Sequence, residues 1–176
     1  MIHLTPADYR RQPWANGRGT TTELYRLEES GHLILRLSMA TVSENGPFSL
    51  FPGIERNLTV LTGPGFTLSG ENLTLHASPL NPVAFPGDIP ITASNVTAPS
   101  EDFNVMTARH LPRPAVRVTH APETLPDGHW ALFALSDARV NDTPLHPHDL
   151  VMLAGIAKVS GRFLAVQLQG VPKQFD

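Results

Sequence analysis

The sequence predicts an all-β protein in which two β-barrel units are fused in one compact body. Three observations support this prediction: 17 prolines and 13 glycines interrupt the chain, only 16% of the residues are charged, and short runs of β-forming residues recur between turn sequences. The turns are spaced by about eight to twelve residues, which is typical of a sandwich or a barrel. One long sandwich, whose turns merely look alike, is the alternative to two barrels.

The N-terminal segment is expected to begin with a short helix. Thr5 is a helix-capping residue, Pro6 suits the first helical position, and Asp8 places an acid three residues after the cap. This helix cannot continue past Pro13. The glycines of residues 14–20 then predict a loop.

The clearest strand lies at residues 33–40. Leu35 and Leu37 alternate there with Arg36 and Ser38, which gives the period of two that is typical of a strand. Further strands of the first half are expected at residues 58–62, 66–68, 73–75, 83–85, 89–92 and 103–109. Gly-Pro-Gly, Ser-Gly-Glu-Asn and Pro-Gly-Asp separate several of these runs, and all three are turn sequences.

The strand pattern starts again after the Pro-Arg-Pro sequence at 112–114. Strands of the second half are expected at residues 130–135, 149–153 and 162–169. Pro-Gly-Asp at 86–88 and Pro-His-Asp at 147–149 hold similar places ahead of a strand, which indicates a weak internal duplication. We therefore predict an N-terminal unit at residues 1–112 and a shorter C-terminal unit at residues 113–176.

The composition excludes several classes of protein. There is no cysteine, so disulfides, thiolate catalysis and cysteine-bound zinc are excluded. The net charge is −3 and the basic residues are scattered, so the sequence predicts no basic surface for nucleic acid. The N-terminus lacks the segments of a signal peptide, and no apolar run reaches membrane-spanning length. We expect a cytoplasmic protein with neither a nucleic-acid nor a membrane partner.

Four motifs of the first half follow one another in a specific order. They are Pro-Trp-Ala-Asn-Gly-Arg-Gly-Thr-Thr-Thr-Glu at 13–23, Leu-Arg-Leu-Ser-Met-Ala at 35–40, Gly-Pro-Phe-Ser-Leu-Phe-Pro-Gly at 46–53 followed by Arg56, and Asp-Phe-Asn-Val-Met at 102–106 followed by Arg109. In this order and spacing the chain resembles the HutD/Ves family of bacterial cupin-like proteins. It departs from the family pattern at Arg18, where the family has a glycine. An arginine there would narrow the loop or add a cation at the mouth of a ligand site.

The resemblance implies a bicupin fold of two jelly-roll-like barrels without the metal that most cupins carry. It also implies a role linked to histidine utilisation, in which the protein binds a small acid of the pathway, such as formylglutamate or urocanate, and restrains the pathway. The residues of the chain also indicate that the cupin metal site is missing. A cupin site needs histidines on a strand, but residues 54–57 offer none, and His146 and His148 are predicted at a surface turn. No cofactor is expected.

Cationic, amide and aromatic side chains remain as candidates for a ligand site. The planar fork of an arginine matches a carboxylate with two parallel hydrogen bonds, and an asparagine can recognise an amide or formyl group. The predicted ligand-binding residues are Trp14, Asn16, Thr20, Arg36, Phe51, Arg56 and Asn104. The alternative for Arg56 is a structural ion pair with Glu55 or Glu23, and the aromatic residues would then form a plain core.

Three functions stay open at this stage. The leading hypothesis is a non-catalytic sensor that binds a small carboxylate. The second is a metal-independent isomerase or hydrolase in which Glu23 or Glu55 acts as general base. The third is an interaction module that uses the proline-rich segment 111–114 and the apolar second unit. The oligomeric state also stays open. Two fused barrels mimic a dimer within one chain, which favours a monomer, whereas edge strands often pair between copies, which favours a homodimer.

Overall fold

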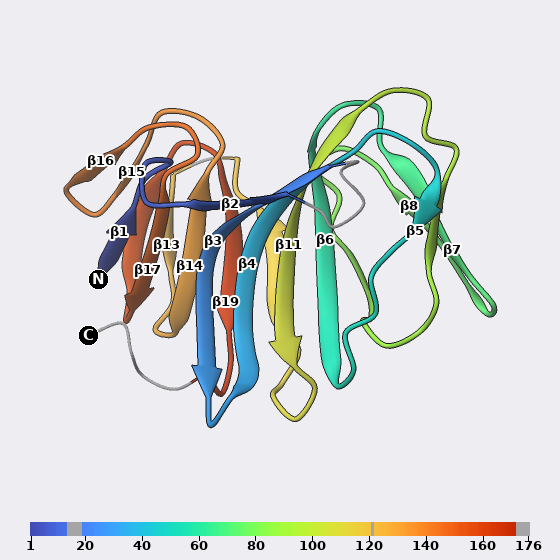
Figure 1. Ribbon diagram of the computed structural model, residues 1–176. Coiled ribbons are helices and arrows are strands. Elements are labelled where there is room, and N and C mark those ends of the chain that lie inside the picture. The colour runs from blue at the N-terminus through green and yellow to red at the C-terminus, as the bar shows by residue number, and fades with distance from the viewer. Residues whose placement is uncertain (14–18, 121, 172–176) are drawn as a thin grey trace. The chain divides into compact units, whose positions relative to one another are not determined.

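The computed structural model describes residues 1–13, 19–120 and 122–171 (Figure 1). It divides into two compact units, one formed by Arg10–His110 and the other by Met1–Tyr9 with Leu111–Asp176. We call them the continuous unit and the discontinuous unit. The N-terminal unit predicted from the sequence included residues 1–9. Residues 1–9 instead group with the C-terminal part, because Ile2–Leu4 pairs with Leu150–Met152.

The continuous unit contains a six-stranded sheet and a four-stranded sheet, both antiparallel. The six-stranded sheet has the order β2 (Arg10–Pro13), β3 (Thr20–Glu29), β4 (His32–Val42), β11 (Ser100–Ala108), β6 (Ile54–Thr62) and β9 (Val83–Pro86). The four-stranded sheet has the order β5 (Gly46–Pro47), β10 (Thr92–Ser94), β7 (Phe66–Gly70) and β8 (Leu73–Ala77). Residues of both sheets form one apolar core, which includes Leu58, Val60, Phe66, Leu68 and Ile91.

The discontinuous unit has the same two-sheet organisation. Its five-stranded sheet has the order β1 (Ile2–Leu4), β17 (Leu150–Ala154), β14 (His129–Ala134), β19 (Phe163–Leu168) and β12 (Ala115–Val118). Its four-stranded sheet has the order β13 (Glu123–Leu125), β18 (Ala157–Ser160), β15 (Ala138–Val140) and β16 (Thr143–Leu145). An apolar core that includes Trp130, Leu132 and Phe163 joins the two sheets.

The all-β prediction is confirmed, since the described residues form strands and turns but no helix. The short helix expected after Thr5 is wrong. Residues 5–8 form a turn in which the Asp8 amide donates to the Thr5 carbonyl at 2.9 Å, and the Thr5 amide donates to the Asp8 carboxylate at 2.8 Å. The capping bonds exist, but β2 begins at Arg10 and leaves too few residues for a helix to propagate. The described residues hold no helix with the length and hydrophobicity that crossing a bilayer requires.

Candidate functional site

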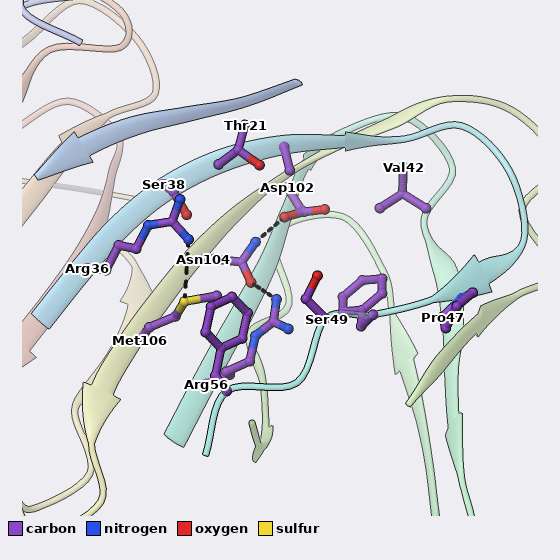
Figure 2. A pocket seen from close by; sticks show the side chains of 13 residues that line it. Thr21, Arg36, Ser38, Val42, Pro47, Ser49, Arg56, Asp102, Asn104 and Met106 are labelled. Atoms are coloured by element: carbon purple, nitrogen blue, oxygen red, sulfur yellow. Dashed lines mark hydrogen bonds between the residues drawn. The ribbon is translucent and has the colours of Figure 1, made fainter. Parts of the chain in front are cut away.

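A cavity of about 390 Å³ lies on the six-stranded sheet of the continuous unit (Figure 2). Its floor comes from β4, β11 and β6, and its rim comes from the segment that connects β5 to β6. Hydrogen bonds fix that segment, because the Phe48 amide donates to the Ile91 carbonyl at 2.8 Å and the Phe51 amide donates to the Gly87 carbonyl at 2.7 Å. The lining residues are Thr21, Arg36, Ser38, Ala40, Val42, Pro47, Phe48, Ser49, Phe51, Arg56, Asp102, Asn104 and Met106.

The register of the sheet determines which side chains meet in the cavity. Arg36 of β4 lies opposite Met106 of β11, and Met106 lies opposite Arg56 of β6. The two arginines therefore share one row, two strand spacings apart, or roughly 9–10 Å between their backbones. In the neighbouring rows β4 contributes Ser38 and Ala40, whose small side chains leave the space that the cavity occupies.

Arg56 is the central cation of the site. Its side chain is buried, with 6% of its surface exposed. The guanidinium carbon lies 5.0, 5.6 and 5.1 Å from the ring centres of Phe48, Phe51 and Phe85, which is cation–π distance. Burial lowers the pKa of Arg56 to about 10, so the group stays charged at neutral pH.

Polar partners of Arg56 form a chain along β11. Its Nη2 donates to Asn104 Oδ1 at 2.6 Å, and Asn104 Nδ2 donates to Asp102 Oδ1 (Figure 2). Within the described part of the molecule, Arg56 Nε and Asp102 Oδ2 are buried without a hydrogen-bond partner. A buried charge that is incompletely paired is costly, so this chain is a candidate for a functional role.

Asp102 is a buried carboxyl group, with 1% of its surface exposed. Burial raises its pKa to about 7, and the opposing effects of Arg56 and of the Asn104 hydrogen bond are smaller. Asp102 lies within one of the four sequence motifs but is not among the predicted ligand-binding residues. The available signal was its spacing, because residues 102 and 104 of a strand point to the same face.

Arg36 reaches the cavity from the opposite side. Its Nε donates to Glu23 Oε2 at 2.6 Å, and its Nη1 lies 3.9 Å from Met106 Sδ. The Arg36 side chain is 11% exposed and the Glu23 side chain 8% exposed, so this ion pair is largely shielded from water. Glu23 fixes the direction of the Arg36 guanidinium and offsets part of its charge.

The structure brings four of the predicted ligand-binding residues together in this cavity: Arg36, Phe51, Arg56 and Asn104. It does not bring Thr20 there, because Thr20 lines a second depression with Arg11, Met39 and Glu101. The predicted residues Trp14 and Asn16, and also Arg18, lie outside the described residues. Whether the four bind a ligand stays a prediction.

The two carboxylates suggested as general bases have other partners. Glu23 bonds to Arg36, and Glu55 accepts from Arg109 Nε at 2.7 Å. Arg109 also donates to both oxygens of Asp88, at 2.7 Å each, and so ties β11 to the turn that follows β9. Neither Glu23 nor Glu55 is among the lining residues of the cavity.

The described residues contain no cluster of three histidine, aspartate or glutamate side chains that could hold a metal ion. In the His146-Pro147-His148 sequence, His146 lies 3.3 Å from Asp137 with its side chain 87% exposed, while the His148 ring stacks on Phe133 at 5.5 Å. The two imidazoles therefore have separate surroundings.

Asp102 is expected to make the protein less stable as the pH rises from about 4 to about 7. Its pKa of about 7 in the folded protein exceeds the usual value of 3.8, so the folded state binds more protons than the unfolded state in this range. The loss is on the order of 3 kcal/mol. Urea unfolding at pH 5 and pH 7.5 should show a larger loss in the wild type than in Asp102→Asn. Equal losses in the two proteins would show that Asp102 does not titrate in this range.

Comparison with known proteins identifies the family. The family model described as HutD matches residues 6–169 of the chain. The chain belongs to the HutD family. It is 37% identical over 117 residues to protein Ves of Citrobacter koseri (63% of this chain and 61% of that protein) and 34% identical over 149 residues to protein Ves of Cronobacter sakazakii (80% and 81%).

A third relative of this HutD-family chain is a 21.2 kDa protein of Pseudomonas putida encoded in the hutC 3′ region, which is 36% identical over 110 residues. The alignment covers 60% of this chain and 57% of the P. putida protein. The chain therefore spans less than two thirds of the length of both the P. putida relative and C. koseri Ves.

Solved structures agree with the family assignment. HutD from Pseudomonas fluorescens SBW25, in a formate condition, matches with a TM-score of 0.86 and 28% identity, over 96% of this chain and 98% of that chain. A cupin 2 conserved barrel domain protein from Leptotrichia buccalis matches with a TM-score of 0.56 and 10% identity, over 86% and 89% of the two chains. The second likeness concerns the fold alone and makes the HutD-family fold cupin-like.

Proposed function

We propose that this protein binds a small carboxylate, formylglutamate-like or urocanate-like, in the cavity of the continuous unit and thereby modulates histidine utilisation. The observation that carries the proposal is the buried guanidinium of Arg56, which lines the cavity and whose Nε has no hydrogen-bond partner among the described residues. A buried guanidinium with an unpaired N–H is incompletely compensated, and an anion in the cavity would offset part of its charge.

The composition of the cavity supports a carboxylate ligand. The volume of about 390 Å³ falls in the range of small-molecule sites, and apolar side chains with a few placed polar groups are the usual lining of such sites. Two guanidinium groups, from Arg36 and Arg56, and one carboxyl group, from Asp102, line this cavity. A guanidinium offers two parallel donors to a carboxylate, and Asn104 adds an amide beside Arg56.

The connection to histidine utilisation rests on the relatives. Membership of the HutD family and the likeness to the P. putida protein of the hutC 3′ region both support it. The finer assignment of the fold is also a proposal: each unit would be one jelly-roll-like barrel of a bicupin, in keeping with two sheets per unit and the likeness to a cupin domain. We also propose that this activity is cytoplasmic.

Thermal unfolding tests the proposal directly. A ligand present at one hundred times its dissociation constant stabilises a protein by about 2.7 kcal/mol, which raises Tm by about 5–10 °C for a chain of this size. We expect such a shift with formylglutamate or urocanate, and a smaller one with formate, the acid named with the P. fluorescens structure. Formamide, which has no charge, serves as the control ligand and should leave Tm unchanged.

The site itself can be checked in the same experiment. The side-chain amide of Asn104 is expected to shift in NMR spectra on addition of the ligand that raises Tm, because it donates and accepts within the cavity. Absence of any Tm shift with all three acids would remove the support for a carboxylate site. A Tm shift that leaves the Asn104 resonances unmoved would place the ligand elsewhere.

A further inference from the structure

The cavity contains a carboxyl group where its proposed ligand also carries one. Among the described residues that line the cavity, Arg36, Arg56 and Asp102 are the ionisable ones, and Asp102 is the sole acid. Figure 2 shows Asp102 joined to Arg56 through Asn104 by two hydrogen bonds. An ionised Asp102 and a bound carboxylate would therefore compete for the same guanidinium.

We propose that Asp102 makes anion binding in this cavity proton-coupled: a carboxylate enters together with one proton, which Asp102 takes up. This inference rests on the proposed function and adds the regulation of the same site. Two like charges beside one cation in a buried site disfavour each other, so that one of the two carboxyl groups is held in its neutral form. Asp102 is almost fully buried, with 1% of its surface exposed, so we expect Asp102 to take the neutral form.

The geometry around Asp102 favours the neutral form. Its Oδ1 accepts from Asn104, whereas its buried Oδ2 has no partner within the described residues, and an unpaired buried carboxyl group costs less free energy when it is neutral than when it is charged. The charged groups that face Asp102 are few. Arg56 of β6 opposes protonation, Glu101 of its own strand favours it, and Arg36 of β4 lines the same cavity, held by Glu23.

The pKa of Asp102 also lies near neutral pH. Burial raises its pKa to about 7, so at neutral pH the group is part protonated and a modest additional bias suffices to complete the change. By linkage, a ligand that favours the protonated form binds more tightly when that form is already present. Affinity should therefore fall as the pH rises through 7, with a limiting slope of about tenfold per pH unit.

Calorimetric titration with formylglutamate between pH 6 and pH 8.5 tests the inference. Both carboxyl groups of this probe titrate below about pH 5, so the probe itself keeps one charge state. We expect the wild-type affinity to fall by about tenfold or more over this range. At pH 7.5, titrations in two buffers of different ionisation enthalpy should reveal proton uptake. Asp102→Asn, which keeps the acceptor for Asn104 but cannot ionise, should show neither effect.

A matched control is available on the same strand. Glu101 precedes Asp102 and lines the second depression but not this cavity. Glu101→Gln should leave the pH dependence in place and move its midpoint to lower pH, because the charge of Glu101 favours protonation of Asp102. If Asp102→Asn does not fold, the carboxyl carbon of Asp102 in the labelled wild type gives the answer by NMR, since its titration should move to higher pH when formylglutamate is present.

The outcomes separate this inference from the proposed function. Binding whose affinity does not change with pH, or whose pH dependence persists in Asp102→Asn, would overturn the proton coupling and leave the carboxylate site standing. The absence of formylglutamate, urocanate and formate binding at every pH, in both wild type and variant, would overturn the site and the coupling together.

Discussion

Replacing Arg56 by alanine is expected to abolish the thermal shift produced by a carboxylate ligand. The guanidinium is the charged group at the centre of the cavity, and truncating one partner of a buried charge pair costs about 2–5 kcal/mol, or at least about 30-fold in affinity. Calorimetric titration of the wild type and of the Arg56→Ala variant with formylglutamate measures the loss.

Two further variants separate charge from shape at this position. Arg56→Lys keeps the charge but loses the planar group that lies among Phe48, Phe51 and Phe85, so we expect weak binding to survive. Arg56→Met keeps much of the volume and provides a binding-deficient protein if the alanine variant does not fold. Arg117→Ala is the control, because this arginine pairs with Glu123 in the discontinuous unit. An unaltered Tm shift in Arg56→Ala would remove Arg56 from the site.

Replacing Gly65 by alanine is expected to destabilise the continuous unit by about 3 kcal/mol or more. Gly65 has a φ of +83°, and a Cβ added there would lie 2.1 Å from the backbone carbonyl oxygen of Ala77. That oxygen is a backbone atom, so it cannot move away by a side-chain rotation. The Gly65 amide also donates to Ser100 Oγ at 2.9 Å, and moving the backbone would break this bond.

Gly31 provides the matched control for this prediction. Its φ of +79° is nearly the same, but a Cβ there would meet no atom within 4 Å. Gly31→Ala should therefore report the conformational penalty alone, about 1 kcal/mol. Urea unfolding of both variants gives the difference, which measures the close approach of Gly65 to Ala77. If both variants lose the same stability, the contact between position 65 and the Ala77 carbonyl does not contribute to the free energy of unfolding.

The sequence predicted the face that carries the site better than it predicted the site itself. The alternation at residues 33–40 predicted a strand with Arg36, Ser38 and Ala40 on one side, and β4 places these three side chains on the floor of the cavity. This prediction was possible because the period of a strand is a local property. The strand expected at residues 89–92 was less accurate: β10 begins only at Thr92, after Pro90, which has no amide hydrogen for a ladder.

The longest strand that was not predicted from the sequence is β3. Residues 20–29 carry four threonine or tyrosine residues, but also three glutamates and an arginine, and their apolar and polar residues do not alternate regularly. The register explains why. The ladder between β3 and β4 shifts at two places, between Glu23 and Tyr25 and between Leu27 and Glu28, so the pattern changes face along the strand. A pattern-based prediction cannot follow such a change without the partner strand.

The role of Asp102 in the cavity could not be predicted either, because it also depends on partner strands. Aspartate is seldom fully buried, so its type gave no reason to expect it inside the cavity. Its burial comes from its position opposite Ala40 of β4 and Val60 of β6, and both of these residues are far from Asp102 in the sequence. Phe85, which completes the rings around Arg56, was overlooked for a similar reason, because β9 reaches Arg56 only through its pairing with β6.

The pairing of β1 with β17 has a consequence for the order in which the chain folds during synthesis. Residues 10–110 contain every partner of their own two sheets, so this segment can fold while the ribosome is still producing the remainder. Strand β1, by contrast, is translated before this segment and must wait for β17, which is translated after it. During that interval its backbone groups are open to pairing with foreign strands, and closure of so distant a contact is intrinsically slow.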